Sequence, residues 1–191
     1  MINSIKNKVI FLSPINEEIQ NFKTGEKCLL VSTENAIKFS RIDIEKIIDI
    51  CNQKPVYEML FRNKLEGKAY GEEQAKNFLS WIVGGWREQK FFVFFVRSSE
   101  GNIIGAVDIK SNDLSRAEIG YWADENHAGI MSNAVTKLIE IARNAGYKIL
   151  FATARLDNKR SQNVLLRNNF LVVGEIEKPN VGKRLLFEFK L

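Results

Sequence analysis

Two segments of this chain place polar residues at the point where a helix is predicted to follow a strand. The first, Asn126-His127-Ala128-Gly129, separates the strand pattern AEIGYWAD from a helix predicted from Ile130. The second, Asn158-Lys159-Arg160-Ser161, follows KILFATARLD and opens another helix. Helix N-termini carry free N–H groups and the positive end of the helix dipole, so both favour anions. We expect the two to border one cleft that can hold an anionic cofactor without a metal ion.

The second half of the chain supplies the elements that must position these segments. An apolar run at 91–96 and the segment 103–110 predict a hairpin, and 117–124 predicts the third strand of the meander. Helix and strand then alternate, and the strands 172–178 and 184–191 close the chain around the turn Pro179-Asn180-Val181-Gly182. The pattern predicts an α/β (α+β) fold.

The first half reads as short strands followed by a helix hairpin. Short strands are predicted at 8–12 and 27–33 around a polar connection, within an N-terminal extension, 1–35, that packs on a domain formed by 36–191. A strand at 36–42 leads to Asp43, which we expect to be the N-cap of a helix over 44–53. Further helices are predicted at 56–62 and from Glu72 to the Gly84-Gly85 pair.

Composition excludes several classes of protein. The chain has 191 residues with 28 basic and 23 acidic side chains, a formal charge of +5, and 45% hydrophobic residues, which suits one folded core. Two distant cysteines and one histidine supply no cysteine/histidine zinc site, so we expect no metal. The chain contains no long apolar run and no secretory signal, which predicts a cytoplasmic protein without a membrane span. The basic residues are scattered, so direct nucleic-acid binding is not expected.

The order of elements and several motifs resemble the GNAT N-acetyltransferase superfamily, and within it the bacterial ribosomal-protein N-terminal acetyltransferases most closely. The motifs are Glu118-Ile119-Gly120-Tyr121-Trp122, Gly129-Ile130-Met131-Ser132, Asp157-Asn158 with Ser161, and Arg167-Asn168-Asn169-Phe170. The resemblance covers about residues 36 to 190. It implies a mixed central sheet, flanked by helices and splayed between its fourth and fifth strands, with acetyl-coenzyme A as cosubstrate in the splay.

The resemblance also implies which residues bind the cosubstrate. Its pantetheine arm is expected to extend the fourth strand, and its pyrophosphate to lie on the helix N-terminus after Gly129. Asn158 is expected to contact the arm, although capping of the next helix explains the same residue. The expected cosubstrate-binding residues are Trp122, Ala123, Gly129, Ile130, Met131, Ser132, Asn158 and Ser161.

Two residues are expected to take part in catalysis. The resemblance suggests that Ser161 lies near the sulfur and protonates the departing thiolate, because this segment lacks the tyrosine that many relatives use there. Glu118 shares a strand face with Gly120 and Trp122, and could relay a proton from the acceptor amine through water. An exposed structural role for Glu118 stays open. His127 is the other titratable candidate, better placed for phosphate or solvent than for the amine.

One departure from the family pattern sustains an alternative function. The pyrophosphate loop usually reads Gln/Arg-x-x-Gly-x-Gly/Ala; with Gly129 as the central glycine, Asn126 and Met131 occupy the outer positions and do not match. The spacing from Trp122 is also shorter than usual. A catalytically weak or inactive GNAT-fold binding module is therefore the alternative to an N-acetyltransferase, and the charge of +5 leaves a nucleic-acid-associated domain as a third hypothesis.

The sequence leaves the acceptor open. Any primary amine fits, whether on a protein N-terminus or on a small molecule, and a homodimer is compatible with the family. Trp81, Trp86, Phe91 and Phe92 make the expected acceptor side aromatic, with core packing as the other explanation.

Overall fold

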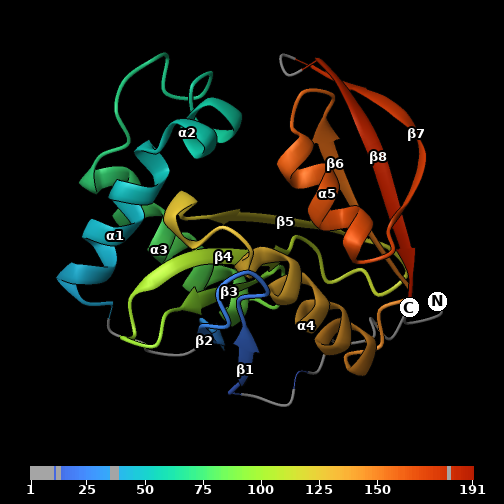
Figure 1. Ribbon diagram of the computed structural model, residues 1–191, viewed down its shortest axis with the longest axis horizontal. Coiled ribbons are helices and arrows are strands. Elements are labelled where there is room, and N and C mark those ends of the chain that lie inside the picture. Colours follow the sequence, from blue (N-terminus) through green and yellow to red (C-terminus); the bar gives the residue numbers. More distant parts are fainter. Residues whose placement is uncertain (1–10, 12–13, 35–38, 180–181) are drawn as a thin grey trace, which may run out of the picture.

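The structure, a computed structural model, describes residues 11, 14–34, 39–179 and 182–191 and contains one eight-stranded sheet (Figure 1). The strands lie in the order β1-β2-β3-β4-β5-β6-β8-β7. All neighbours are antiparallel except β5 and β6, which are parallel. The strands are β1 Asn16–Gln20, β2 Lys27–Ser32, β3 Phe92–Arg97, β4 Ile103–Ile109, β5 Ala117–Ala123, β6 Ile149–Arg155, β7 Leu171–Lys178 and β8 Gly182–Lys190. The mixed α/β class expected from the sequence is confirmed.

The sheet is splayed between β5 and β6. These two strands have 7 residues each, yet they pair only at Ala117↔Leu150 and Glu118↔Phe151. Figure 1 shows β5 crossing the middle of the molecule while β6, β7 and β8 diverge upward beside α5 (Lys159–Arg167). The residues Gly120–Ala123 are half-buried although β5 is an interior strand, because the neighbouring strand has separated from them. The splay that the resemblance implied is therefore present in this chain.

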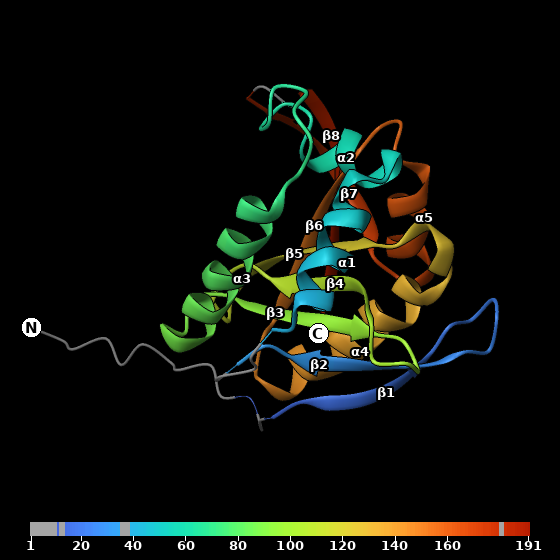
Figure 2. The same ribbon diagram turned by 90° about the vertical axis from the view of Figure 1, so that its left-hand side faces the viewer.

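Helices cover the two faces of the β1–β5 part of the sheet, each over its own core. On one face α1 (Arg41–Asn52) and α3 (Glu72–Arg87) bury residues such as Ile47 and Ile82 against Phe95 and Val93. On the other, α4 (Ile130–Asn144) packs residues such as Leu138 on the opposite side chains of the same strands. Figure 2 shows the sheet between these layers. Successive side chains of a strand point to opposite faces, and β3 and β4 are buried along nearly their whole length, so helices must cover both faces of the sheet.

The first helix begins earlier than the sequence predicted, and Asp43 is not its N-cap. Ser40 caps α1: its Oγ accepts a hydrogen bond from Asp43 N at 3.1 Å, and the Asp43 carboxylate accepts one from Ser40 N at 2.9 Å. Asp43 also pairs with Arg97 at 2.8 Å. This reciprocal capping box moves the helix start to Arg41 and puts Arg41 and Ile42 of the predicted strand 36–42 into the helix, while 39–40 are not in a strand. Residues 36–38 lie outside the described part.

The predicted N-terminal strands and the end of α3 need correction too. The first strand is β1, Asn16–Gln20, within the segment expected to be a polar connection, whereas the predicted strand 8–12 falls almost wholly outside the described residues. β1 and β2 extend the sheet at its β3 edge. The helix α3 continues through Gly84 and Gly85 to Arg87. The Phe91 ring packs on Gly85, where a Cβ would lie 2.2 Å from that ring. The turn predicted at 179–182 includes residues 180 and 181, which lie outside the part of the chain that the structure describes. α2 spans Lys54–Leu60, with Pro55 in its first turn.

Candidate active site

The structure brings Ser161 of α5 into direct contact with Tyr121 of β5, across the splay. The Tyr121 hydroxyl lies 2.8 Å from Ser161 Oγ and donates a hydrogen bond to the Ser161 carbonyl oxygen at 3.0 Å. Burial raises the pKa of Tyr121, although its hydrogen bond with Ser161 opposes the shift, so the phenol stays protonated at neutral pH. The Tyr121 phenol and the Ser161 hydroxyl therefore form a hydrogen-bonded pair in which each oxygen carries a proton. Sequence reasoning found no tyrosine after Asn158 and missed this one, which comes from another element.

Asn158 has the capping position that the sequence allowed. Its Oδ1 accepts a hydrogen bond from Ser161 N at 3.1 Å, which makes it the N-cap of α5. Gln162 reinforces the turn, since its Nε2 donates to Arg155 O at 2.8 Å and to Leu156 O at 3.1 Å. These bonds fix the start of α5 beside the end of β6, and with it the position of Ser161.

The N-terminus of α4 has no side-chain cap among the described residues. Gly129 is the N-cap, with φ of 115° in the left-handed region. In the first turn, Ser132 is 6% exposed, and its Oγ has no hydrogen-bond partner within the described part of the chain. An uncapped helix start with a buried free hydroxyl can bind an anion such as phosphate.

The sequence attributed Gly129 to close approach of a ligand, but a protein segment makes that approach. A Cβ on Gly129 would lie 2.4 Å from Asn21 Oδ1 and 2.9 Å from Lys23 Cγ, both in the β1–β2 connection. Glycine is therefore required here by the N-terminal hairpin and by the positive φ. A ligand at this helix start must approach from another side.

The loop between β5 and α4 is held from within and from the helix hairpin. It forms a short 3₁₀ helix, Glu125–His127, capped by Asp124. Asp124 accepts hydrogen bonds from Gln53 Nε2 at 2.8 Å and from Asn126 N at 3.0 Å, and its Oδ2 lies 3.0 Å from His127 Nδ1. Burial opposes ionisation of Asp124, but these contacts outweigh it and lower its pKa. The His127 ring therefore contacts the Asp124 carboxylate of its own loop.

Glu118 lies on the β5 face that carries Trp122, and two lysines hold its carboxylate. Lys110 Nζ and Lys178 Nζ each lie 3.3 Å from Glu118 Oε1. Burial opposes ionisation, but the two ammonium groups outweigh it and lower the pKa of Glu118. A carboxylate stabilised in this way is a weaker proton acceptor than a free one.

A second carboxyl, which the sequence did not single out, lies beside Glu118. Asp108 of β4 is paired in register with Gly120 of β5, and its Oδ1 has no hydrogen-bond partner among the described residues. A Cβ on Gly120 would lie 2.9 Å from that oxygen and 2.8 Å from Lys110 Cε, so only glycine leaves room for both side chains. Burial raises the pKa of Asp108, against the opposing charge of Lys110. The sequence signal that could have indicated Asp108 is an acidic residue within the otherwise apolar strand Ile103–Ile109.

The aromatic residues near this face divide between core and surface. Trp86 and Phe92 are buried in the core under α4. Trp81 is 51% exposed and stacks on Phe91 with ring centroids 4.0 Å apart, while Phe78 lies 6.3 Å from Trp122. Core packing therefore explains Trp86 and Phe92, whereas the stacked rings of Trp81 and Phe91 border solvent.

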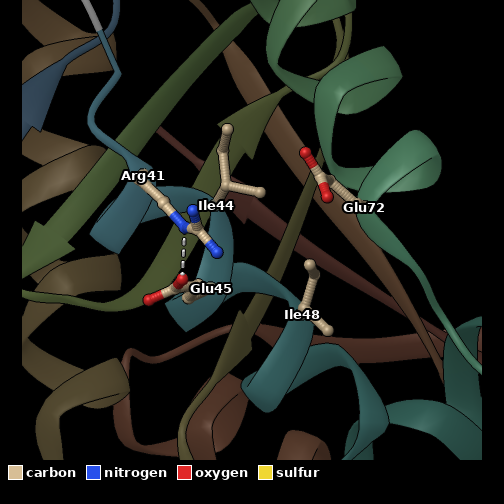
Figure 3. Close-up of a pocket in the computed structure, with 5 residues that line it drawn as sticks. All are labelled: Arg41, Ile44, Glu45, Ile48 and Glu72. Atoms are coloured by element: carbon tan, nitrogen blue, oxygen red, sulfur yellow. Dashed lines mark hydrogen bonds and ion pairs between the residues drawn. The ribbon is translucent and has the colours of Figure 1, made fainter.

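A surface hollow on α1 is separate from these groups. Figure 3 shows its lining residues on α1 and at the start of α3, with the Arg41–Glu45 ion pair of 2.8 Å among them. None of the predicted site residues lines it; its residues are Arg41, Ile44, Glu45, Ile48 and Glu72.

Within the part of the chain that the structure describes, there is no group of His, Cys, Asp and Glu side chains that could hold a metal ion. None of the described helices is long and apolar enough to span a bilayer.

Comparison with known proteins defines the class. The family model described as acetyltransferase (GNAT) domain matches residues 37–171. The ribosomal-protein-serine acetyltransferase of Escherichia coli (strain K12) is 30% identical over 134 residues, 63% of this chain and 74% of that protein. This chain belongs to the GNAT acetyltransferase family, so it is an enzyme that transfers an acetyl group from acetyl-coenzyme A.

Solved structures share the fold. The microcin C7 self-immunity acetyltransferase MccE, in complex with acetyl-CoA and AMP, has a TM-score of 0.70 and 20% identity, with 86% of this chain and 92% of that chain covered. RimL, a ribosomal L7/L12 alpha-N-protein acetyltransferase in complex with coenzyme A, has a TM-score of 0.70 and 16% identity, with coverages of 92% and 98%.

Proposed function

We propose that this enzyme acetylates the α-amino group of a protein N-terminus, with a ribosomal protein as the acceptor class. The observation that carries the proposal is the 30% identity to a ribosomal-protein-serine acetyltransferase over most of that protein's length. The exposed Trp81 ring, which stacks on the half-buried Phe91, supports it, and so do the carboxyl groups of Asp108 and Glu118. A peptide N-terminus offers both apolar surface and an ammonium group.

Acetyl-coenzyme A is proposed to bind in the splay between β5 and β6. The ladder stops after Glu118, so the β6-facing edge of Ile119–Ala123 is free to pair with an extended amide-bearing arm, near Trp122 and Ala123. The phosphates are assigned to the start of α4, at Gly129, Ile130, Met131 and Ser132, where the helix is uncapped and Ser132 Oγ is free. Asn158 and Ser161 border the same opening from α5.

Different side chains are proposed to accept and to donate the protons of the reaction. The acceptor amine must lose a proton before its nitrogen bonds to the carbonyl carbon and the carbon–sulfur bond breaks. Glu118 is proposed to receive that proton through water, and Asp108 is the second carboxyl on the same face. Ser161 is proposed to supply a proton to the departing thiolate, and Tyr121 holds Ser161 Oγ in position.

The test measures coenzyme A release with peptides that carry ribosomal-protein N-termini, against the same peptides acetylated in advance. Release with free α-amines, and product mass increased at the first residue, is the expected result. Transfer to lysine side chains or to small polyamines alone would contradict the acceptor assignment.

Glu118→Gln tests the base, with Glu188→Gln as the matched control. Both carboxylates are half-buried ion-pair partners, Glu188 to Arg116 at 2.7 Å. We expect E118Q to lower kcat about 100-fold, within the usual range for general base catalysis, and E188Q to leave it nearly unchanged. Equal kcat values in the two variants would remove Glu118 from the reaction.

A further inference from the structure

The connection between β1 and β2 packs directly on the start of α4, although the two are about a hundred residues apart. Asn21 is 1% exposed, and its Nδ2 donates to His127 O at 3.5 Å and to Ala128 O at 3.4 Å. Its Oδ1 accepts a hydrogen bond from Lys23 N at 2.9 Å, which fixes the turn. The hairpin therefore sets the position of the residues that precede α4. Figure 2 shows this turn projecting past α4.

Lys23 extends over Gly129 from this turn. Its Cγ lies 2.9 Å, and its Cβ 3.1 Å, from the position that a Gly129 Cβ would take, so the aliphatic stem lies against the glycine. Lys23 is exposed, and no ion pair is found for it within the described residues. Lys27 on the same hairpin differs, because it pairs with Glu18 at 3.1 Å.

The helix start beneath Lys23 has free donors but little positive charge of its own. The segment from Asp124 to Met131 contains two acidic residues and no lysine or arginine. Ser132 supplies a buried Oγ without a partner in the described structure, and Gly129 supplies no side-chain cap. An anion with several negative charges would gain most from a cation brought in by another element.

A second cation borders the same turn. The Arg167 guanidinium of α5 lies 5.0 Å from the centroid of the Phe22 ring. The exposed Phe22 ring, which precedes Lys23 in the sequence, thus holds Arg167 at this turn.

We propose that Lys23 is a ligand for the phosphate groups of acetyl-coenzyme A, so that the N-terminal hairpin completes the cosubstrate site at the start of α4. The proposal rests on the proposed placement of the phosphates there. Coenzyme A carries a diphosphate and a 3′-phosphate, and an ammonium group from Lys23 can pair with either. The hairpin thus contributes the charge that the loop before α4 lacks.

The experiment compares the intact protein with Lys23→Gln and with the control Lys27→Gln, by calorimetric titration with coenzyme A, 3′-dephospho-coenzyme A and pantetheine. We expect K23Q to bind coenzyme A about tenfold more weakly, since one charge-assisted contact is lost, and K27Q to bind it as the wild type does. Pantetheine should bind equally to all three proteins. A defect that persists with 3′-dephospho-coenzyme A assigns Lys23 to the diphosphate, and one that disappears assigns it to the 3′-phosphate.

Three outcomes would contradict the proposal in distinguishable ways. Wild-type affinity of K23Q for coenzyme A would remove Lys23 from the site and leave the proposed function intact. An equal loss for pantetheine would show that the substitution acts through the fold. Failure of the wild type itself to bind coenzyme A would overturn the proposed function together with this assignment.

Discussion

The Tyr121 hydroxyl lies 2.8 Å from Ser161 Oγ, so the residue expected to protonate the thiolate is held by a phenol from the strand across the splay. The two residues are 40 positions apart. Because strand residues alternate between faces, Tyr121 points to α5 while Glu118 and Trp122 point to the opposite face. One short strand thus carries the proposed base, Glu118, and also Tyr121, which contacts the proposed acid, Ser161.

Ser161→Ala should lower kcat about 100-fold with little change in KM for acetyl-coenzyme A, because general acid catalysis acts on the transition state. Tyr121→Phe should lower kcat about tenfold, since it removes one hydrogen bond that orients Ser161. Steady-state thiol release measures both, with the exposed Asn163→Ala as the control on the same helix. The double variant should resemble S161A alone; additive losses would show that the two hydroxyls act separately.

Gly129→Ala should destabilise the protein through both backbone strain and contact with the hairpin. Gly101→Ala is the matched control, because Gly101 also has positive φ, at 84°, but has no neighbouring atom within 4 Å of its Cβ position. Strain alone costs about 1–2 kcal/mol, which we expect for G101A. G129A should lose roughly 1–3 kcal/mol more, as expected for overpacking. Urea unfolding measures both; equal losses would show that the hairpin yields to the added methyl group.

Asn158→Ala and Asn158→Asp separate capping from cosubstrate binding. The alanine variant should lose about 1 kcal/mol of unfolding free energy, whereas aspartate caps helices as well as asparagine does and should restore it. Aspartate lacks the amide donor, so KM for acetyl-coenzyme A should stay raised in N158D if Asn158 binds the pantetheine arm. Recovery of KM together with stability would leave Asn158 with its cap alone.

Asp108→Asn should change how stability depends on pH. Burial raises the pKa of Asp108 in the folded state, so its contribution to stability is fully present below the unfolded pKa, near 3.8, and is lost as pH rises through the folded pKa. Asparagine should therefore raise the free energy of unfolding at pH 8, where the buried carboxylate is charged, and leave it nearly unchanged at pH 3. Denaturant titrations at the two pH values measure this difference. An equal effect at both would show that ionisation of Asp108 carries no cost.

The amino-acid sequence by itself determined the class of fold and most of the elements around the site. The apolar run at 91–96 and its hairpin partner predicted β3 and β4, and the next strand of the meander predicted β5. The break at Gly129 predicted the start of α4, and Asn158 predicted the cap of α5. These are local signals, because strand period, glycine and capping residues act over a few positions. The motifs around Glu118, Gly129 and Asn158 were sufficient to indicate the family.

Only the tertiary structure decided which groups meet. Local pattern could not pair Tyr121 with Ser161, set Asp108 beside Gly120, or bring Asn21 and Lys23 onto Gly129, because strand order and packing fix these contacts between distant positions. It also misplaced the α1 cap, where the Asp43–Arg97 ion pair and Ser40 together decide the helix start. The local pattern specifies which segments form helices and strands, and packing of those segments specifies which side chains share a site.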